Sequence, residues 1–178
     1  MCEQKFEQEQ CPLTPGKKIL WFICPEDEQR SSGELSALLE NVQTRIVYNN
    51  LRSCDEVTGW ENTRCDTPEA IFSRIEDLQS GDCYILDSLE LVCCPRKADF
   101  NSELVSFGKK LFQRASSCGV DCIIIASKRS QKVMEKLQLP MPSWLQELKA
   151  AADIVFEDAT LQPSSPAVGD LFQLHLQI

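Results

Sequence analysis

The chain has 178 residues, a formal net charge of −9 and a hydrophobic share of 43%. This composition predicts one soluble globular domain and excludes wholesale disorder. No apolar run approaches the roughly 20 residues of a membrane span, and the acidic start MCEQKFEQEQC lacks the apolar core of a secretory signal. We therefore expect a protein of the cytoplasm or the nucleus without a membrane partner. The acidic balance also argues against a broad nucleic-acid-binding surface, because phosphate binding requires clustered Lys and Arg.

The first half of the chain predicts a strand, a helix and a second strand. Residues 18–24 (KILWFIC) form the short apolar run of a buried strand. Leucine and valine then recur at helical spacing over 35–42, with Ser31 or Ser32 as the cap. The apolar run RIVY follows over 45–48. A strand–helix–strand unit has a handed crossover, so this order implies parallel strands.

The second half continues the alternation of helices and strands. Thr67-Pro68 is a strong helix start, because Thr67 can cap and Pro68 has no N–H to satisfy in the first turn. Asn101 or Ser102 is expected to cap a later helix that Gly119 ends. The remaining expected elements are a strand over 83–87, a strand over 122–126, a helix over 144–151, a strand over 153–156 and a terminal strand over 171–178.

This order predicts an α/β fold with a mostly parallel sheet in a single domain over 18–178, preceded by a polar segment over 1–17. The stretch 49–64 shows no period and is expected to be a loop with Trp60 as its aromatic anchor. The terminal segment 171–178 alternates apolar and polar residues, which favours an edge or antiparallel position.

The cysteines and the histidine predict no metal site and no catalytic group. The density of the ten cysteines is below the roughly 8–10% of disulfide scaffolds. Three of them lie inside apolar runs, where a thiol packs as a small hydrophobic group: Cys24, Cys83 and Cys122. The close pairs Cys93-Cys94 and Cys118-x-x-x-Cys122 lack the spacing of structural zinc sites. The single His175 alternates with apolar residues, as expected for one face of a strand.

The sharpest candidate for chemistry is Asp87-Ser88, at the end of the apolar run CYILD. A carboxylate at this place is typical of the second nucleotide strand of a P-loop ATPase, where it meets the water shell of a magnesium ion. The other interpretation is that Asp87 caps a helix beginning at Ser88. The two interpretations remain open at this point.

The motif that would hold phosphates is missing from the chain. No G-x-x-x-x-G-K-[ST] loop occurs. Gly16-Lys17-Lys18 is not such a loop, because a strand follows it directly where a helix is required. Glu26 follows the first strand where related ATPases carry a catalytic glutamate, but it also fits an ordinary acidic loop. We therefore predict no enzymatic activity and no cofactor.

A basic segment follows the CIIIA strand and carries Lys128, Arg129 and Lys132 in an otherwise acidic chain. In ring-forming ATPases the loop at this place faces the central channel and meets nucleic acid. The competing interpretation is a solvated loop that runs into an exposed helix. The segment is therefore a candidate nucleic-acid-facing loop.

The order of these elements resembles the RecA-type ATPase core from its second strand onward, without the first, phosphate-loop strand. Within that superfamily three stretches look like the fifth subunit of Elongator: RIVYNN with Trp60 downstream, TPEAIFSRIEDLQSGDCYILDSLELV, and GDLFQLHLQI. That subunit also lacks a phosphate loop. The resemblance implies a RecA-like, doubly wound sheet in which Asp87 and Ser88 are the remnant of the magnesium-binding strand.

The resemblance also implies partners. Elongator's fourth, fifth and sixth subunits have RecA-type folds and form a hetero-hexameric ring that binds transfer RNA and assists modification of the wobble uridine. In such a ring the apolar helix face with Leu104, Phe107 and Leu111 is expected to exceed what one domain can cover. Two other hypotheses remain: a recombinase-paralogue adaptor in DNA repair, which shares the fold, and a degenerate ATP-dependent enzyme.

Overall fold

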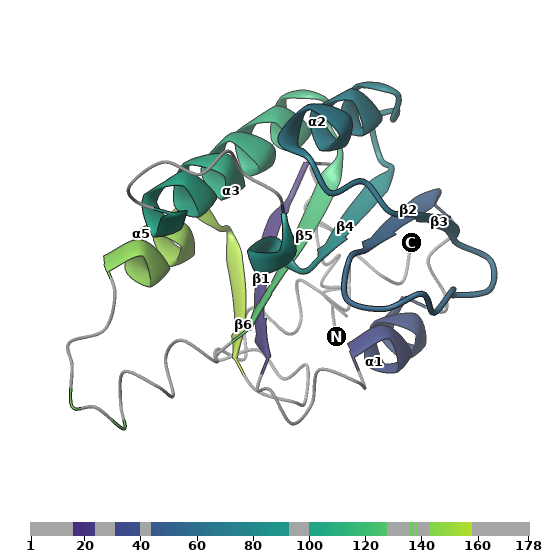
Figure 1. The fold of residues 1–178 in the computed structure, drawn as a ribbon. Coiled ribbons are helices and arrows are strands. Elements are labelled where there is room, and N and C mark those ends of the chain that lie inside the picture. The colour runs from purple at the N-terminus through teal and green to yellow at the C-terminus, as the bar shows by residue number, and fades with distance from the viewer. Residues whose placement is uncertain are drawn as a thin grey trace, which may run out of the picture.

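The computed structural model describes residues 16–23, 31–39, 44–92, 100–127, 136, 138 and 143–157. Their centre is a six-stranded sheet with the strand order β3-β2-β4-β5-β1-β6, in which every neighbouring pair is parallel (Figure 1). The strands are β1 (Lys18–Ile23), β2 (Ile46–Asn50), β3 (Glu61–Thr63), β4 (Cys83–Asp87), β5 (Asp121–Ser127) and β6 (Ile154–Glu157). The predicted α/β class with a mostly parallel sheet is confirmed.

Helices cover both faces of this sheet. The described helical elements are α1 (Ser31–Leu38), α2 (Pro68–Glu76), the short 3₁₀ helix η2 (Leu89–Leu91), α3 (Phe100–Ser117) and α5 (Ser143–Ala151). Buried side chains of α2, α3 and α5 pack in one core on one face, and those of α1 pack in a second core on the other face (Figure 1). The sheet is therefore doubly wound. Among the described residues, no helix is long and apolar enough to cross a membrane.

Alternation along each strand divides the apolar side chains between the two cores. On β5, Cys122 and Ile124 face the core under α2, α3 and α5, whereas Ile123 and Ile125 face the core under α1. A strand that is buried on both faces must be apolar at nearly every position. This explains why the runs KILWFI, CYILD and CIIIA are continuous rather than alternating.

Local signals in the sequence fix two helix ends. The Thr67 side chain accepts a hydrogen bond from the backbone N–H of Ala70, at 3.3 Å, so Thr67 caps α2 as predicted. Gly119 ends α3 with a φ of 71°, a left-handed conformation that favours glycine. The N–H of Val120 donates to the Ala115 carbonyl at 2.9 Å, which completes a Schellman motif.

Three expectations from the sequence need correction. Helix α3 begins at Phe100, so Asn101 and Ser102 lie inside its first turn and do not cap it. The stretch 49–64 contains β3, which the sequence pattern missed because the strand has only three residues and no apolar period. The expected terminal strand 171–178 lies outside the described residues.

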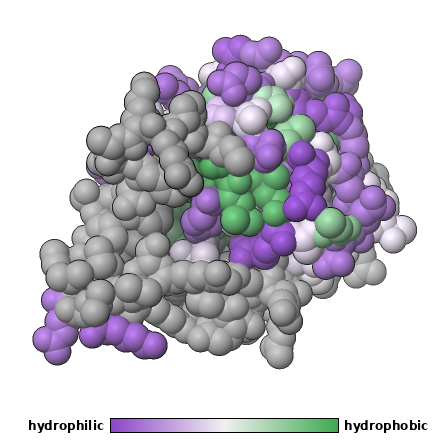
Figure 2. Space-filling view, in the orientation of Figure 1, coloured by the Kyte–Doolittle hydropathy of each residue, from purple (hydrophilic) through white to green (hydrophobic). Residues whose placement is uncertain are grey.

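The apolar face of α3 is covered within the domain, contrary to the expectation that it would exceed the available cover. Leu104, Phe107 and Leu111 are buried in the core that α3 shares with the sheet, α2 and α5. Figure 2 shows one compact apolar area among polar residues and segments drawn in grey. Leu91, with 46% exposure, is the exposed large hydrophobic residue among those described. An association surface on this domain is therefore not the buried face of α3.

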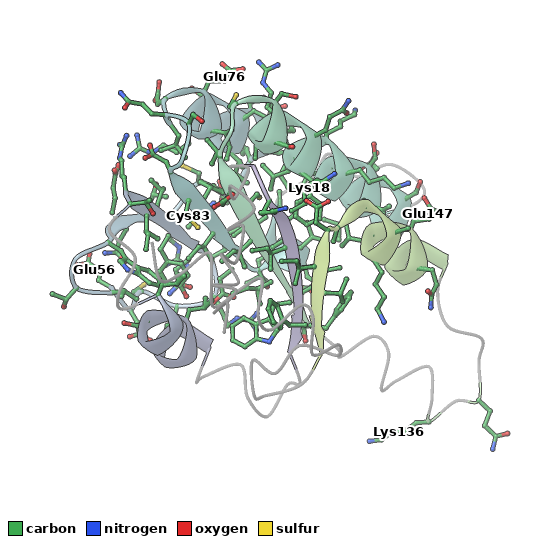
Figure 3. All side chains as sticks on the ribbon, turned by 180° about the vertical axis from the view of Figure 1, so that it is seen from behind. Lys18, Glu56, Glu76, Cys83, Lys136 and Glu147 are labelled. Atoms are coloured by element: carbon green, nitrogen blue, oxygen red, sulfur yellow. The ribbon has the colours of Figure 1, made fainter. Side chains whose placement is uncertain are left out.

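Ion pairs tie the helical layer together on its outer surface. Glu76 on α2 and Glu147 on α5 point outward from this layer, whereas Cys83 lies within the sheet (Figure 3). Arg114 of α3 pairs with Glu76, and Lys109 Nζ of α3 lies 2.8 Å from Glu147 Oε2. The central helix of this face thus contacts both of its neighbours.

The connections between strands reverse direction at β1 and β5, which are adjacent in the sheet. After β1 the chain runs to β2 on one side, and after β5 it runs to β6 on the other side of β1. In open α/β sheets, ligand sites lie outside the carboxyl ends of the strands at such a reversal. Strand β1 is followed by α1, so it has the strand–loop–helix context of a phosphate loop. This differs from the sequence expectation that the phosphate-loop strand is absent: residues 24–30 stand in that context with the sequence CPEDEQR.

Candidate functional site

Buried polar side chains gather where three neighbouring strands end. Parallel strands present their carboxyl ends at one edge of the sheet, so these residues share that edge. They are Asn49 and Asn50 at the end of β2, Asp87 and Ser88 at the end of β4, and Ser127 at the end of β5. Burial of so many polar groups at one edge makes it the candidate functional site.

Asp87 binds two side chains of this same chain. The Tyr48 hydroxyl donates to Asp87 Oδ2 at 2.8 Å, and Arg52 Nε donates to Asp87 Oδ1 at 2.9 Å. Asp87 is 1% exposed. The helix-cap interpretation is wrong, because the N-cap position of η2 is Ser88 and no side chain forms a cap hydrogen bond there. The carboxylate of Asp87 instead turns toward β2 and the loop that follows it.

Tyr48 reaches Asp87 because of the strand register. Tyr48 stands opposite Ile85, so Asp87 is its diagonal neighbour on the same face of the sheet. The ring of Trp60 meets the ring of Tyr48 edge to face, with 5.6 Å between centroids. Burial first, and then the charge of Asp87, raises the pKa of the Tyr48 phenol well above its usual range. Tyr48 therefore stays protonated and acts as a donor.

Arg52 is positioned by the first turn of the loop between β2 and β3. Asn50 Oδ1 accepts hydrogen bonds from the backbone N–H groups of Arg52 and Ser53, each at 3.0 Å. Asn50 Nδ2 donates to Ser53 Oγ at 3.0 Å and to the Asp55 carbonyl at 3.2 Å. The Leu51 N–H donates to the backbone carbonyl of Asp87 at 2.6 Å. The loop is thus fastened to the ends of both β2 and β4, which holds the guanidinium over Asp87.

A second polar contact lies on the other face of the same strand ends. Asn49 Nδ2 donates to the Tyr84 hydroxyl at 2.9 Å and to the Cys65 carbonyl at 2.8 Å, and its Oδ1 accepts from the Cys65 N–H at 2.9 Å. Burial raises the pKa of the Tyr84 phenol. Asn49 therefore joins β4 to the segment after β3, which is a structural role.

Glu90 adds a carboxylate beside the end of β5. Its Oε1 accepts a hydrogen bond from the backbone N–H of Ser127. Its Oε2 is buried and has no hydrogen-bond partner within the described part of the chain. Burial raises the pKa of the Glu90 carboxyl, although the hydrogen bond from Ser127 and the charge of Arg52 oppose this shift. Glu90 links the connection after β4 to the end of β5.

Sequence reasoning found one half of this site. It identified Asp87 and Ser88 but missed Tyr48, Arg52 and Glu90. The signal for Tyr48 was present only as a polar tip in an apolar strand, and Arg52 lies in a stretch without a period. The predicted loop residues Lys128, Arg129 and Lys132, as well as Glu26 and His175, lie outside the described residues.

By sequence, the chain matches no protein-family model and no curated protein. By structure, it is similar to a DnaB-like replicative helicase described with its interactions with primase, at a TM-score of 0.58 and 13% identity, covering 80% of this chain and 46% of that one. The fold is RecA-like. A solved ATPase domain of a second protein matches the RecA-like domain at a TM-score of 0.58 and 13% identity, with 80% of this chain and 69% of that one covered.

The RadB recombinase matches the RecA-like domain at a TM-score of 0.53 and 12% identity, covering 82% of this chain and 76% of that one. Identities this low show a common fold and leave the activity to the residues of the site. The chain spans slightly less than half of the DnaB-like helicase, so that protein's activity does not transfer with the fold.

The fold implies a magnesium–nucleotide site, and the residues present do not fit one. Such a site needs a carboxylate with a free oxygen directed at the water shell of the metal ion, and a loop of backbone amides around the phosphates. Here Asp87 Oδ1 accepts from a guanidinium and Asp87 Oδ2 accepts from a phenol. The sequence between β1 and α1 has no glycine and no lysine. Within the described residues, no group of three His, Cys, Asp or Glu side chains could hold a metal ion.

Proposed function

We propose that this chain is a non-catalytic, RecA-like subunit of the Elongator accessory ring and that it supports transfer RNA binding and wobble-uridine modification. The observation that carries the non-catalytic part is the engagement of both Asp87 oxygens by Tyr48 and Arg52. The missing phosphate loop supports the same conclusion. The three sequence stretches that resemble the fifth Elongator subunit support the assignment to this ring.

The proposed role in RNA binding is assigned to Lys128, Arg129 and Lys132. Strand β5 ends at Ser127, on the same edge of the sheet as Asp87, so the basic segment begins at this edge. A cluster of three cations attracts phosphate through release of counterions, even in a chain with a net charge of −9. The ring partners would supply the rest of the RNA-binding surface.

Affinity purification of the full chain from its native cells tests the assembly. We expect the paralogous RecA-like Elongator subunits to co-purify in a stoichiometric complex. Recovery of a recombinase with its DNA-repair partners instead would reject the ring and support the adaptor hypothesis. Hydrolysis of ATP by the purified chain, abolished by Asp87→Asn, would reject the non-catalytic assignment.

Transfer RNA binding by the reconstituted ring tests the basic segment. We expect the triple variant Lys128→Ala/Arg129→Ala/Lys132→Ala to weaken binding and to reduce its dependence on salt. The matched control removes three cations from the exposed face of α3: Lys109, Lys110 and Arg114. Equal losses in the two triple variants would show that only net charge matters, which would contradict the assigned loop.

A further inference from the structure

We infer that the Arg52 guanidinium takes the place of a metal ion at the Asp87 carboxylate, so that the carboxyl edge of this domain carries a built-in cation and excludes divalent metals. The inference concerns residues of this chain alone and does not depend on the partners proposed above. Its basis is the contact between Arg52 Nε and Asp87 Oδ1, at 2.9 Å.

The contact has the burial expected of a permanent ion pair. The side chain of Asp87 is 1% exposed and that of Arg52 is 16% exposed. Solvent screening is weak at such a position, so the pair interacts more strongly than ion pairs on the surface. The Tyr48 hydroxyl occupies the second oxygen of Asp87 at 2.8 Å. The charge of Asp87 is therefore balanced and its geometry is fixed without a bound ion.

Arginine suits this role because its charge and its position are both constant. A guanidinium stays protonated at any physiological pH and is more weakly hydrated than an ammonium group. Asn50 binds the backbone of Arg52, so the loop does not need to reorganise to present the side chain. A divalent ion at Asp87 would lie next to this fixed positive charge in a poorly screened place. Repulsion between the two cations would oppose metal binding.

The geometry also indicates what removal of Arg52 would expose. Asp87 Oδ1 would lose its cationic donor, while Tyr48 and Ser88 would remain beside it as oxygen-bearing groups. Carboxylate, hydroxyl and water oxygens are the ligands that Mg²⁺ and Mn²⁺ prefer. Neutralising Arg52 should therefore create weak divalent binding that depends on Asp87.

Binding of Mn²⁺ to the full chain, measured by electron paramagnetic resonance of the free ion, tests the inference. We expect the wild type to bind no Mn²⁺ that Asp87→Asn removes. We expect Arg52→Gln to bind Mn²⁺ at least about tenfold more tightly than the wild type, and the double variant Arg52→Gln/Asp87→Asn to lose this gain. Arg52→Lys keeps the cation and should bind as little as the wild type.

Arg64→Gln is the matched control, because Arg64 is exposed on the neighbouring segment and the change removes the same charge. Two results would overturn the inference: Mn²⁺ binding by the wild type that Asp87→Asn abolishes, or a folded Arg52→Gln variant without Asp87-dependent binding. If Arg52→Gln does not fold, the comparison of the wild type, Arg52→Lys and Asp87→Asn decides, since Asp87-dependent binding in either cationic form contradicts the built-in cation.

Discussion

The Tyr48 hydroxyl donates a 2.8 Å hydrogen bond to Asp87 Oδ2 from a diagonal position on the adjacent strand. Both residues are buried, and the second oxygen of Asp87 accepts from Arg52. A slip of one residue between β2 and β4 would turn Tyr48 to the opposite face of the sheet. The contact therefore helps to specify the register of the two strands as well as the state of the carboxylate.

Tyr48→Phe should lower the free energy of unfolding by about 1–3 kcal/mol, because Asp87 Oδ2 loses its donor in a buried place. Urea unfolding of the single variants Tyr48→Phe and Asp87→Asn and of the double variant measures the coupling. We expect the double variant to lose less than the sum of the two single changes. Strict additivity would show that the contact contributes nothing.

Arg52→Ala should destabilise the domain by about 3–5 kcal/mol, because it leaves the buried Asp87 carboxylate without its cation. Arg64→Ala, at an exposed position, should change stability by no more than about 0.5 kcal/mol. Guanidinium unfolding curves of the two variants provide the comparison. Similar midpoints for both would mean that the Arg52 pair behaves as an ordinary surface pair.

Glu90→Gln should stabilise the domain at neutral pH. The pKa of the Glu90 carboxyl is raised by burial, so the folded state favours the protonated form and the ionised form is destabilising above that pKa. The contribution of Glu90 to stability is complete below the pKa of the unfolded chain and is lost as the pH rises through the folded-state pKa. Unfolding measured from pH 4 to pH 8 should show the advantage of Gln growing with pH. A constant difference would contradict the shift.

Gly119→Ala should destabilise the end of α3 by about 1–3 kcal/mol, because an alanine there must adopt a left-handed φ. Its Cβ would also lie 2.4 Å from Ser80 Oγ. Gly33→Ala is the matched control within α1, where a new Cβ meets nothing within 4 Å. That change should stabilise by roughly 0.5–1 kcal/mol. Thermal unfolding of both variants would show opposite signs if the two environments are as described.

Local chemistry explains why much of the fold could be predicted. Thr67 and Pro68 fix the start of α2 because a cap and a missing N–H act within one turn. The run CYILD is apolar at four positions because both faces of β4 are covered. The start of α3 was predicted incorrectly, since Asn101 and Ser102 have capping side chains but the helix begins before them. Caps compete with tertiary packing, and here packing decided the boundary.

The sequence by itself determined the α/β class, the strand that ends in Asp87, and the absence of a phosphate-loop motif, because these depend on residue type and on spacing along one segment. Only the tertiary structure decided which groups meet Asp87. Tyr48 and Arg52 lie 39 and 35 residues away along the chain, and they reach the carboxylate through strand register and the fold of one loop. The same aspartate could have faced a metal ion, a helix N-terminus or a guanidinium. Three-dimensional contacts chose the guanidinium.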